Sequence, residues 1–153
     1  MSRTIVLLLT LGLLSLDSRS AVAQIVTFSV TPTTPISMNI TSVPAAGSQP
    51  TSITNTATAY KYLSLFAPDK KITAQLNAPM PTGMTLTATY AAAGGGTSVG
   101  PVVLDATARN MVVNMGAALG GNTTITYVLS ATVAAGVVPL QTRTVTLTLL
   151  NYP

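Results

Sequence analysis

The chain has 153 residues, of which 48% are hydrophobic and only 7% are charged, and it contains neither Cys nor His. This composition excludes disulfide bonds and removes the thiolate and imidazole groups on which most transition-metal sites and catalytic triads depend. The sequence pI of about 9.8 reflects a shortage of acidic residues, since the chain has 7 Lys and Arg against 3 Asp and Glu. The basic residues are scattered, and only Lys70 and Lys71 are adjacent. Nucleic acid is therefore not an expected partner.

The first 23 residues are predicted to be a secretory signal peptide. Arg3 precedes a short apolar core at residues 4–16, and the small residues Ala21 and Ala23 precede a cleavage site before Gln24. The core is shorter than the roughly 20 residues that a helix needs to cross a membrane, which disfavours a retained anchor. No later segment is expected to span a membrane as a helix. We expect residues 24–153 to be exported, to the periplasm, the cell surface or the extracellular space.

Apolar and polar residues alternate along residues 24–153 with the period of two that is typical of β-strands. The first such segment is IVTFSV, residues 25–30, which places Val26, Phe28 and Val30 on one face. Segments rich in Pro and Gly separate the alternating runs at intervals of roughly ten residues. In chain order, the expected strands are 25–30, 36–40, 71–77, 83–90, 123–133 and 142–150, with weaker candidates at 51–57, 60–66, 101–104 and 108–115.

The closing segment TRTVTLTLL, residues 142–150, directs Val145, Leu147 and Leu149 to one face and Thr side chains to the other. We predict that it is the second arm of a hairpin whose first arm is 122–133. Residues 24–153 contain 24 Thr, so Thr takes the outward positions that charged residues occupy in most strands. The pattern predicts an all-β chain: a single immunoglobulin-like antiparallel β-sandwich of about seven to nine strands in residues 24–153.

Few residues are available for catalysis. Asp69 and Asp105 are the only carboxylates of residues 24–153, and solvated loop positions are a better interpretation than a glycosidase pair. Ser64 and Lys61 are three apart in an expected strand and so should face opposite sides, which disfavours a dyad. No catalytic residue, metal ligand or cofactor is predicted, and the chain is not expected to be an enzyme.

Aromatic residues cluster in YKYLSLF, residues 60–66. Tyr60, Tyr62 and Phe66 could form a binding platform for a sugar or a peptide. The favoured alternative is a strand that turns these rings toward the core, since aromatic side chains contribute the largest buried areas in most proteins.

Several features resemble subunits of exported bacterial fimbriae and related coat proteins: the signal peptide, the N-terminal segment QIVTFSVTPTTPISM, the Thr-rich and weakly charged strands, and a final strand with Tyr152 close behind it. The resemblance implies a homopolymer in which the N-terminal segment completes the sheet of the next subunit, with Val26, Phe28 and Val30 inserted. The disulfide of many such subunits is absent here. The alternative is a monomeric periplasmic or extracellular binding module, or an accessory subunit of an envelope complex. In either case we expect protein partners, either self or envelope proteins.

Overall fold

The computed structural model describes residues 23–41, 45 and 47–153. The predicted signal peptide, residues 1–23, lies outside the described residues except for Ala23. Within the described part of the chain, no helix is long and apolar enough to cross a membrane. The regular structure there consists of β-strands and one short 3-10 turn, η1 (Val133–Ala135).

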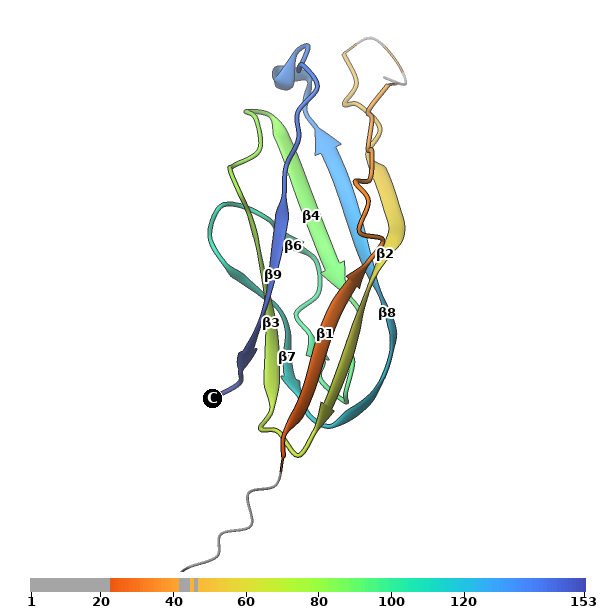
Figure 1. Ribbon diagram of the computed structural model, residues 1–153. Helices are drawn as coiled ribbons and strands as arrows, with labels where there is room; N and C mark the ends of the chain where they lie inside the picture. Colours follow the sequence, from red (N-terminus) through yellow and green to blue (C-terminus); the bar gives the residue numbers. More distant parts are fainter. Residues whose placement is uncertain (1–22, 42–44, 46) are drawn as a thin grey trace, which may run out of the picture.

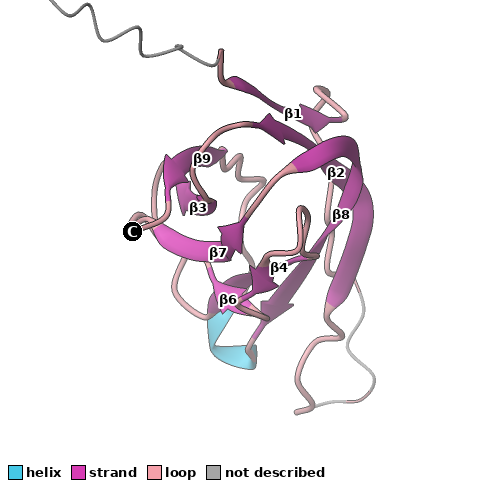
Figure 2. Ribbon diagram, turned by 90° about the horizontal axis from the view of Figure 1, so that it is seen from below, coloured by secondary structure: helices cyan, strands magenta, loops and turns pink. Residues whose placement is uncertain are grey.

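The strands form two antiparallel sheets that face each other (Figure 1 and Figure 2). One sheet has the order β1-β2-β8-β4-β6, and the other has the order β5-β7-β3-β9. The predicted all-β class with antiparallel sheets is therefore confirmed. The bounds are β1 Ile25–Thr31, β2 Ile53–Leu65, β3 Lys70–Leu76, β4 Met84–Tyr90, β5 Thr97–Ser98, β6 Val102–Val103, β7 Arg109–Met115, β8 Ala118–Ala131 and β9 Val145–Asn151.

Alternation of apolar and polar residues decides which face of each strand is buried. In β4 the side chains of Leu86, Ala88 and Tyr90 are buried, while the Thr residues between them are partly exposed. β8 follows the same pattern and contributes Ile125 to the core, and β3 contributes Ile72, although Thr73 of β3 is buried as well. Because successive side chains of a strand point to opposite faces, one apolar face per strand is enough to fill the space between two sheets.

Four buried tyrosines lie at the centre of the core. The rings of Tyr60 and Tyr90 are 6.2 Å apart between centroids, and the rings of Tyr90 and Tyr127 meet edge to face at 6.5 Å. The Tyr62 hydroxyl donates to the carbonyl oxygen of Gly116 at 3.1 Å. These rings come from β2, β4 and β8. They therefore pack three strands of one sheet against one another and fill the space toward the facing sheet.

The predicted hairpin between 122–133 and 142–150 is wrong. β8 pairs with β2 and β4, whereas β9 pairs with β3 in the opposite sheet, from Lys70 opposite Asn151 to Leu76 opposite Val145. The connection between β8 and β9 is long enough to cross from one sheet to the other, and chain proximity alone does not determine a strand's partner.

The segment 36–40 also differs from the prediction, because it is not a strand. Ile36, Met38 and Ile40 do turn toward the core and pack against it, as the alternation indicates. The segment has no ladder partner, however. The weaker candidates 51–57 and 60–66 are parts of one long strand, β2, whose pairing with β8 is interrupted by register shifts between Asn55 and Thr58 and between Lys61 and Leu63.

Candidate functional site

A groove of about 990 Å³ opens along one side of the two sheets, beyond the C-terminal end of β1. Its floor is apolar and includes Met84 and Leu86 of β4 and Tyr127 and Leu129 of β8. Two segments without strand partners form its walls, residues 32–41 on one side and residues 135–144 on the other. The groove is therefore a part of the core that the sheets leave uncovered.

The first wall leaves the sheet because of its prolines. Pro32 and Pro35 follow β1 and have no N–H group to donate to a ladder, so strand pairing ends at Thr31. Ile36, Met38 and Ile40 then turn into the groove side of the core and are half-buried. Beyond β1 the chain thus covers the apolar floor with side chains, while its backbone forms no ladder.

The second wall is held by hydrogen bonds to the connection between β3 and β4. Asn77 and Thr144 form two of them: the Asn77 N–H donates to the Thr144 carbonyl at 3.0 Å, and the Thr144 N–H donates to the Asn77 Oδ1 at 2.9 Å. Arg143 Nε donates to the Pro79 carbonyl at 3.0 Å. Arg143 is the one charged residue among the described residues that line the groove, so an apolar and mostly uncharged segment would suit it.

β9 is an edge strand of the second sheet and lies at the same side of the molecule as β1, the edge strand of the first (Figure 1 and Figure 2). It has seven residues with an unbroken register against β3, and it contains no Pro and no charged residue. Natural proteins usually protect such an edge with charge, Pro or a bulge. None of these devices is present in β9, so its free N–H and C=O groups form a template for another strand.

The predicted strand-exchange residues lie on one face of β1, but Val26 is exposed near the start of the strand, whereas Phe28 and Val30 are half-buried. In the register between β1 and β2, Val26 is opposite Ser64, Phe28 is opposite Tyr62 and Val30 is opposite Tyr60. Phe28 and Val30 pack against the core, and the Phe28 ring is 6.1 Å from the Tyr60 ring. In this structure β1 therefore pairs within its own chain.

The predicted platform residues are not brought together on a surface. Tyr60 and Tyr62 are fully buried, and the Tyr60 hydroxyl donates to the Ala91 carbonyl at 2.6 Å. Burial raises the pKa of Tyr60 to about 12, because the charged phenolate would lose its hydration. Phe66 lies beyond the end of β2 with a φ of 58° and is 71% exposed. The two tyrosines thus agree with the core-facing alternative, and Phe66 does not share their face.

The two carboxylates lie at opposite ends of β3. The Asp69 carbonyl accepts from the N–H of Tyr152, whereas the Asp105 carbonyl accepts from the N–H of Leu76. The seven residues of β3 separate these contacts by roughly 20 Å, so the two acids do not form a catalytic pair. The described residues contain no group of three or more His, Cys, Asp or Glu that could hold a metal ion.

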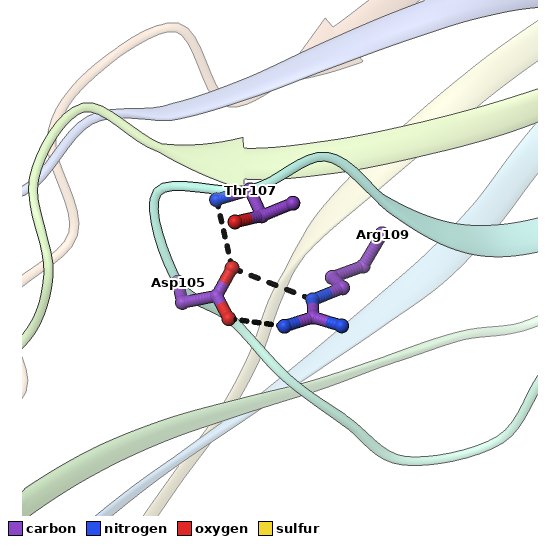
Figure 3. Close-up of polar contacts among 3 residues, drawn as sticks. All are labelled: Asp105, Thr107 and Arg109. Atoms are coloured by element: carbon purple, nitrogen blue, oxygen red, sulfur yellow. Dashed lines mark hydrogen bonds and ion pairs between the residues drawn. The ribbon is translucent and has the colours of Figure 1, made fainter.

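Asp105 instead organises the loop before β7 (Figure 3). Its Oδ1 accepts from the Thr107 N–H at 2.7 Å, and its Oδ2 forms an ion pair of 2.5 Å with Arg109 Nη2. The hydrogen bond from Arg109, followed by that from Thr107, lowers the pKa of the Asp105 carboxyl below its usual value. Both partners are exposed to solvent, so this pair orders a turn and adds little stability.

Ser64 and Lys61 face opposite sides of β2, as their spacing predicts. Ser64 is buried, and its Oγ has no hydrogen-bond partner among the described residues, while Lys61 is exposed. A nucleophile and base dyad would need both groups on one face. The structure therefore does not bring Ser64 and Lys61 together.

The sequence did not reveal the groove, although two signals mark its walls. The first signal is the alternation of apolar and polar residues in 36–40, which follows a Pro-rich break. The second is the uncharged, apolar connection 133–141.

Comparisons with protein-family models, with curated proteins and with solved structures found no match to this chain. The groove and the strand edges beside it are therefore the features from which a function can be inferred.

Proposed function

We propose that this protein is an exported structural subunit with an immunoglobulin-like β-sandwich, and that its copies join by strand addition at the cell envelope or surface. The observation that carries the proposal is the unprotected edge of β9 beside an apolar groove. An added strand would pair its backbone with β9 and place alternate side chains in the groove, which is a known mode of peptide recognition. The proposal includes no catalytic step and no cofactor.

The proposed donor is β1 of a second copy, with Val26, Phe28 and Val30 as the inserted side chains. β1 pairs with β2 alone, so its release breaks no other strand pairing. It has the same length as β9, seven residues. The exchange would therefore replace one antiparallel ladder with another of equal length, and the burial of apolar groove surface would provide the net gain.

A second candidate function is a monomeric binding module or accessory subunit of an envelope complex. The pairing of β1 with β2 within one chain supports it, because that pairing leaves the groove available to a segment of another protein. In that case residues 24–153 would stay monomeric, and the groove would bind an extended peptide from an envelope protein.

The test is size-exclusion chromatography with light scattering on residues 24–153, together with two Thr→Lys variants. Thr148→Lys places a charge on the exposed face of the β9 edge, whereas Thr124→Lys places the same charge on the exposed face of β8, a strand with neighbours on both sides. We expect oligomers for the unmodified chain and for Thr124→Lys, and monomers for Thr148→Lys. Deletion of residues 24–31 should also give monomers.

An unmodified chain that is monomeric at all concentrations would reject self-assembly and favour the binding module. Oligomers that survive Thr148→Lys would show that β9 is not the receiving edge. Circular dichroism of each variant would establish whether a monomer is folded, so that loss of assembly is separated from loss of structure.

A further inference from the structure

The residues directly before β1 lie outside the sheet. Ala23 and Gln24 are both exposed. The ladder between β1 and β2 begins one residue later, with Ile25 opposite Leu65. The peptide bond between Ala23 and Gln24, at which the leader is predicted to end, therefore lies in exposed backbone that no strand pairing covers. Cleavage at this bond would leave Gln24 as an exposed N-terminal residue.

An N-terminal glutamine can react with itself, because its α-amino group reaches its own side-chain amide. The unprotonated amine attacks the carbonyl carbon Cδ, and the new N–Cδ bond closes a five-membered lactam. The bond between Cδ and Nε2 breaks, and the side-chain nitrogen leaves as ammonia with the proton that the attacking amine gives up. The product is pyroglutamate, and the step requires no oxidant, reductant or metal.

The ring is compatible with the fold, because it is confined to residue 24. The lactam keeps the backbone carbonyl of Gln24 and one N–H, and the backbone of β1 from Ile25 to Thr31 is unchanged. Residue 24 takes part in no pairing of the β1–β2 register, so a change of geometry there breaks no strand pairing. At this strand end Ile25 and Val26 are 48% and 36% exposed, so the ring would meet solvent rather than the packed core.

A free amino group at Gln24 would be the one charge in a long uncharged stretch. No Asp, Glu, Lys, Arg or His occurs between Gln24 and Tyr60, and the first charged residue is Lys61. An α-amine is mostly protonated at neutral pH. An ammonium group directly before Ile25 would oppose the transfer of β1 into an apolar site, because burial of an unpaired charge is costly. Cyclisation converts the amine to a neutral amide and so removes this charge.

We propose that Gln24 becomes the N-terminal residue of the exported chain and is converted there to pyroglutamate, so that a neutral, blocked end precedes β1. The inference rests on export with removal of the leader, which belongs to the proposed function, and it does not require self-assembly. A blocked end also stops aminopeptidases at residue 24, before they reach Val26 and Phe28 of the proposed donor strand.

The intact mass of the exported chain tests this modification. The full chain would be produced with its own leader in a bacterial host, purified after export and kept at neutral pH until its mass is constant. We expect a chain that starts at residue 24 and whose mass is lower, by one ammonia, than the mass of residues 24–153. Edman degradation should give no sequence, and pyroglutamyl aminopeptidase should release residue 24 and expose the amine of Ile25.

Gln24→Asn is the matched control, because it keeps an amide side chain that is one methylene shorter. Its cyclisation would require a strained four-membered ring, so this variant should retain a free amine and its full mass. A general aminopeptidase should remove residue 24 from Gln24→Asn and leave the end of the unmodified chain intact.

Three outcomes would overturn the inference, and they separate it from the proposed function. A chain that starts at residue 24 and keeps a free amine would reject the modification while export stands. A chain that retains residues 1–23, or that starts elsewhere, would reject the predicted removal of the leader together with the modification. Loss of ammonia from Gln24→Asn as well would place the reaction at another amide and contradict the assignment to Gln24.

Discussion

The hydroxyl groups of four tyrosines lie within the core, and each has a hydrogen-bond partner. The Tyr60 and Tyr62 hydroxyls donate to backbone carbonyls, while those of Tyr90 and Tyr127 are within 3.3 Å of each other. A buried hydroxyl without a partner loses its hydration without compensation, at a cost of about 1–3 kcal/mol. The tyrosines therefore provide large apolar rings and also hold the positions of the strands that they contact.

At the level of single residues, the pair formed by Tyr90 and Tyr127 should behave as a unit. Tyr90→Phe leaves the Tyr127 hydroxyl without its partner, and we expect it to lower the free energy of unfolding by about 1–3 kcal/mol. Tyr127→Phe should have a similar effect. The double variant should lose clearly less than the sum of the two, because neither polar group is then left alone. Urea unfolding of all four proteins gives this double-mutant cycle, and strict additivity would contradict the coupling.

At the level of elements, the placement of η1 depends on a close approach to Gly83, the residue before β4. The Thr132 N–H donates to the Gly83 carbonyl at 2.8 Å, which fixes the end of β8 beside the start of β4. A Cβ atom at Gly83 would lie 2.7 Å from the backbone nitrogen of Ala135. Because η1 begins the connection that forms one wall of the groove, this glycine helps to position the groove wall.

Gly83→Ala should therefore destabilise the protein more than Gly95→Ala does. Both glycines have a positive φ, of 79° and 69°, so each substitution has a similar backbone cost. Only position 83 adds a clash with backbone atoms, since nothing lies within 4 Å of a Cβ at Gly95. We expect a difference of at least about 1 kcal/mol in the free energy of unfolding, measured with urea. Equal losses would show that η1 moves away at no cost.

At the level of the whole molecule, stability depends on packing and strand pairing, since there are no disulfides and few charges. Burial raises the pKa of Tyr60 from 10.0 to about 12 and raises those of Tyr90 and Tyr127 as well. Above pH 10 the unfolded chain releases tyrosine protons that the folded chain retains. Stability is therefore fully present below pH 10 and falls as the pH rises further.

We expect the free energy of unfolding to be nearly constant between pH 7 and pH 9 and to fall between pH 10 and pH 12. Tyr60 alone should account for about 2–3 kcal/mol of this loss, the equivalent of its raised pKa. Urea midpoints measured across this range provide the test, with Tyr60→Phe as the control that should make the decline shallower. A midpoint that does not change up to pH 12 would show that the tyrosines ionise freely in the folded state.

The residue pattern alone determined the all-β class and the buried face of most strands. In β3, β4 and β9 the predicted inward residues are those that face the core, because a period of two fixes the face of every side chain once a strand forms. The signal peptide remains a prediction from sequence, since it lies outside the described residues apart from Ala23.

Only the tertiary structure decided which strands pair. β9 joins β3 instead of β8, and the alternating segment 36–40 has no ladder partner. The turn after Leu65 likewise separates Phe66 from Tyr60 and Tyr62. Backbone hydrogen bonds join residues far apart in the chain, and alternation specifies a face but not a neighbour. The groove and the free edge of β9 follow from these distant pairings, so they could not be read from the sequence by itself.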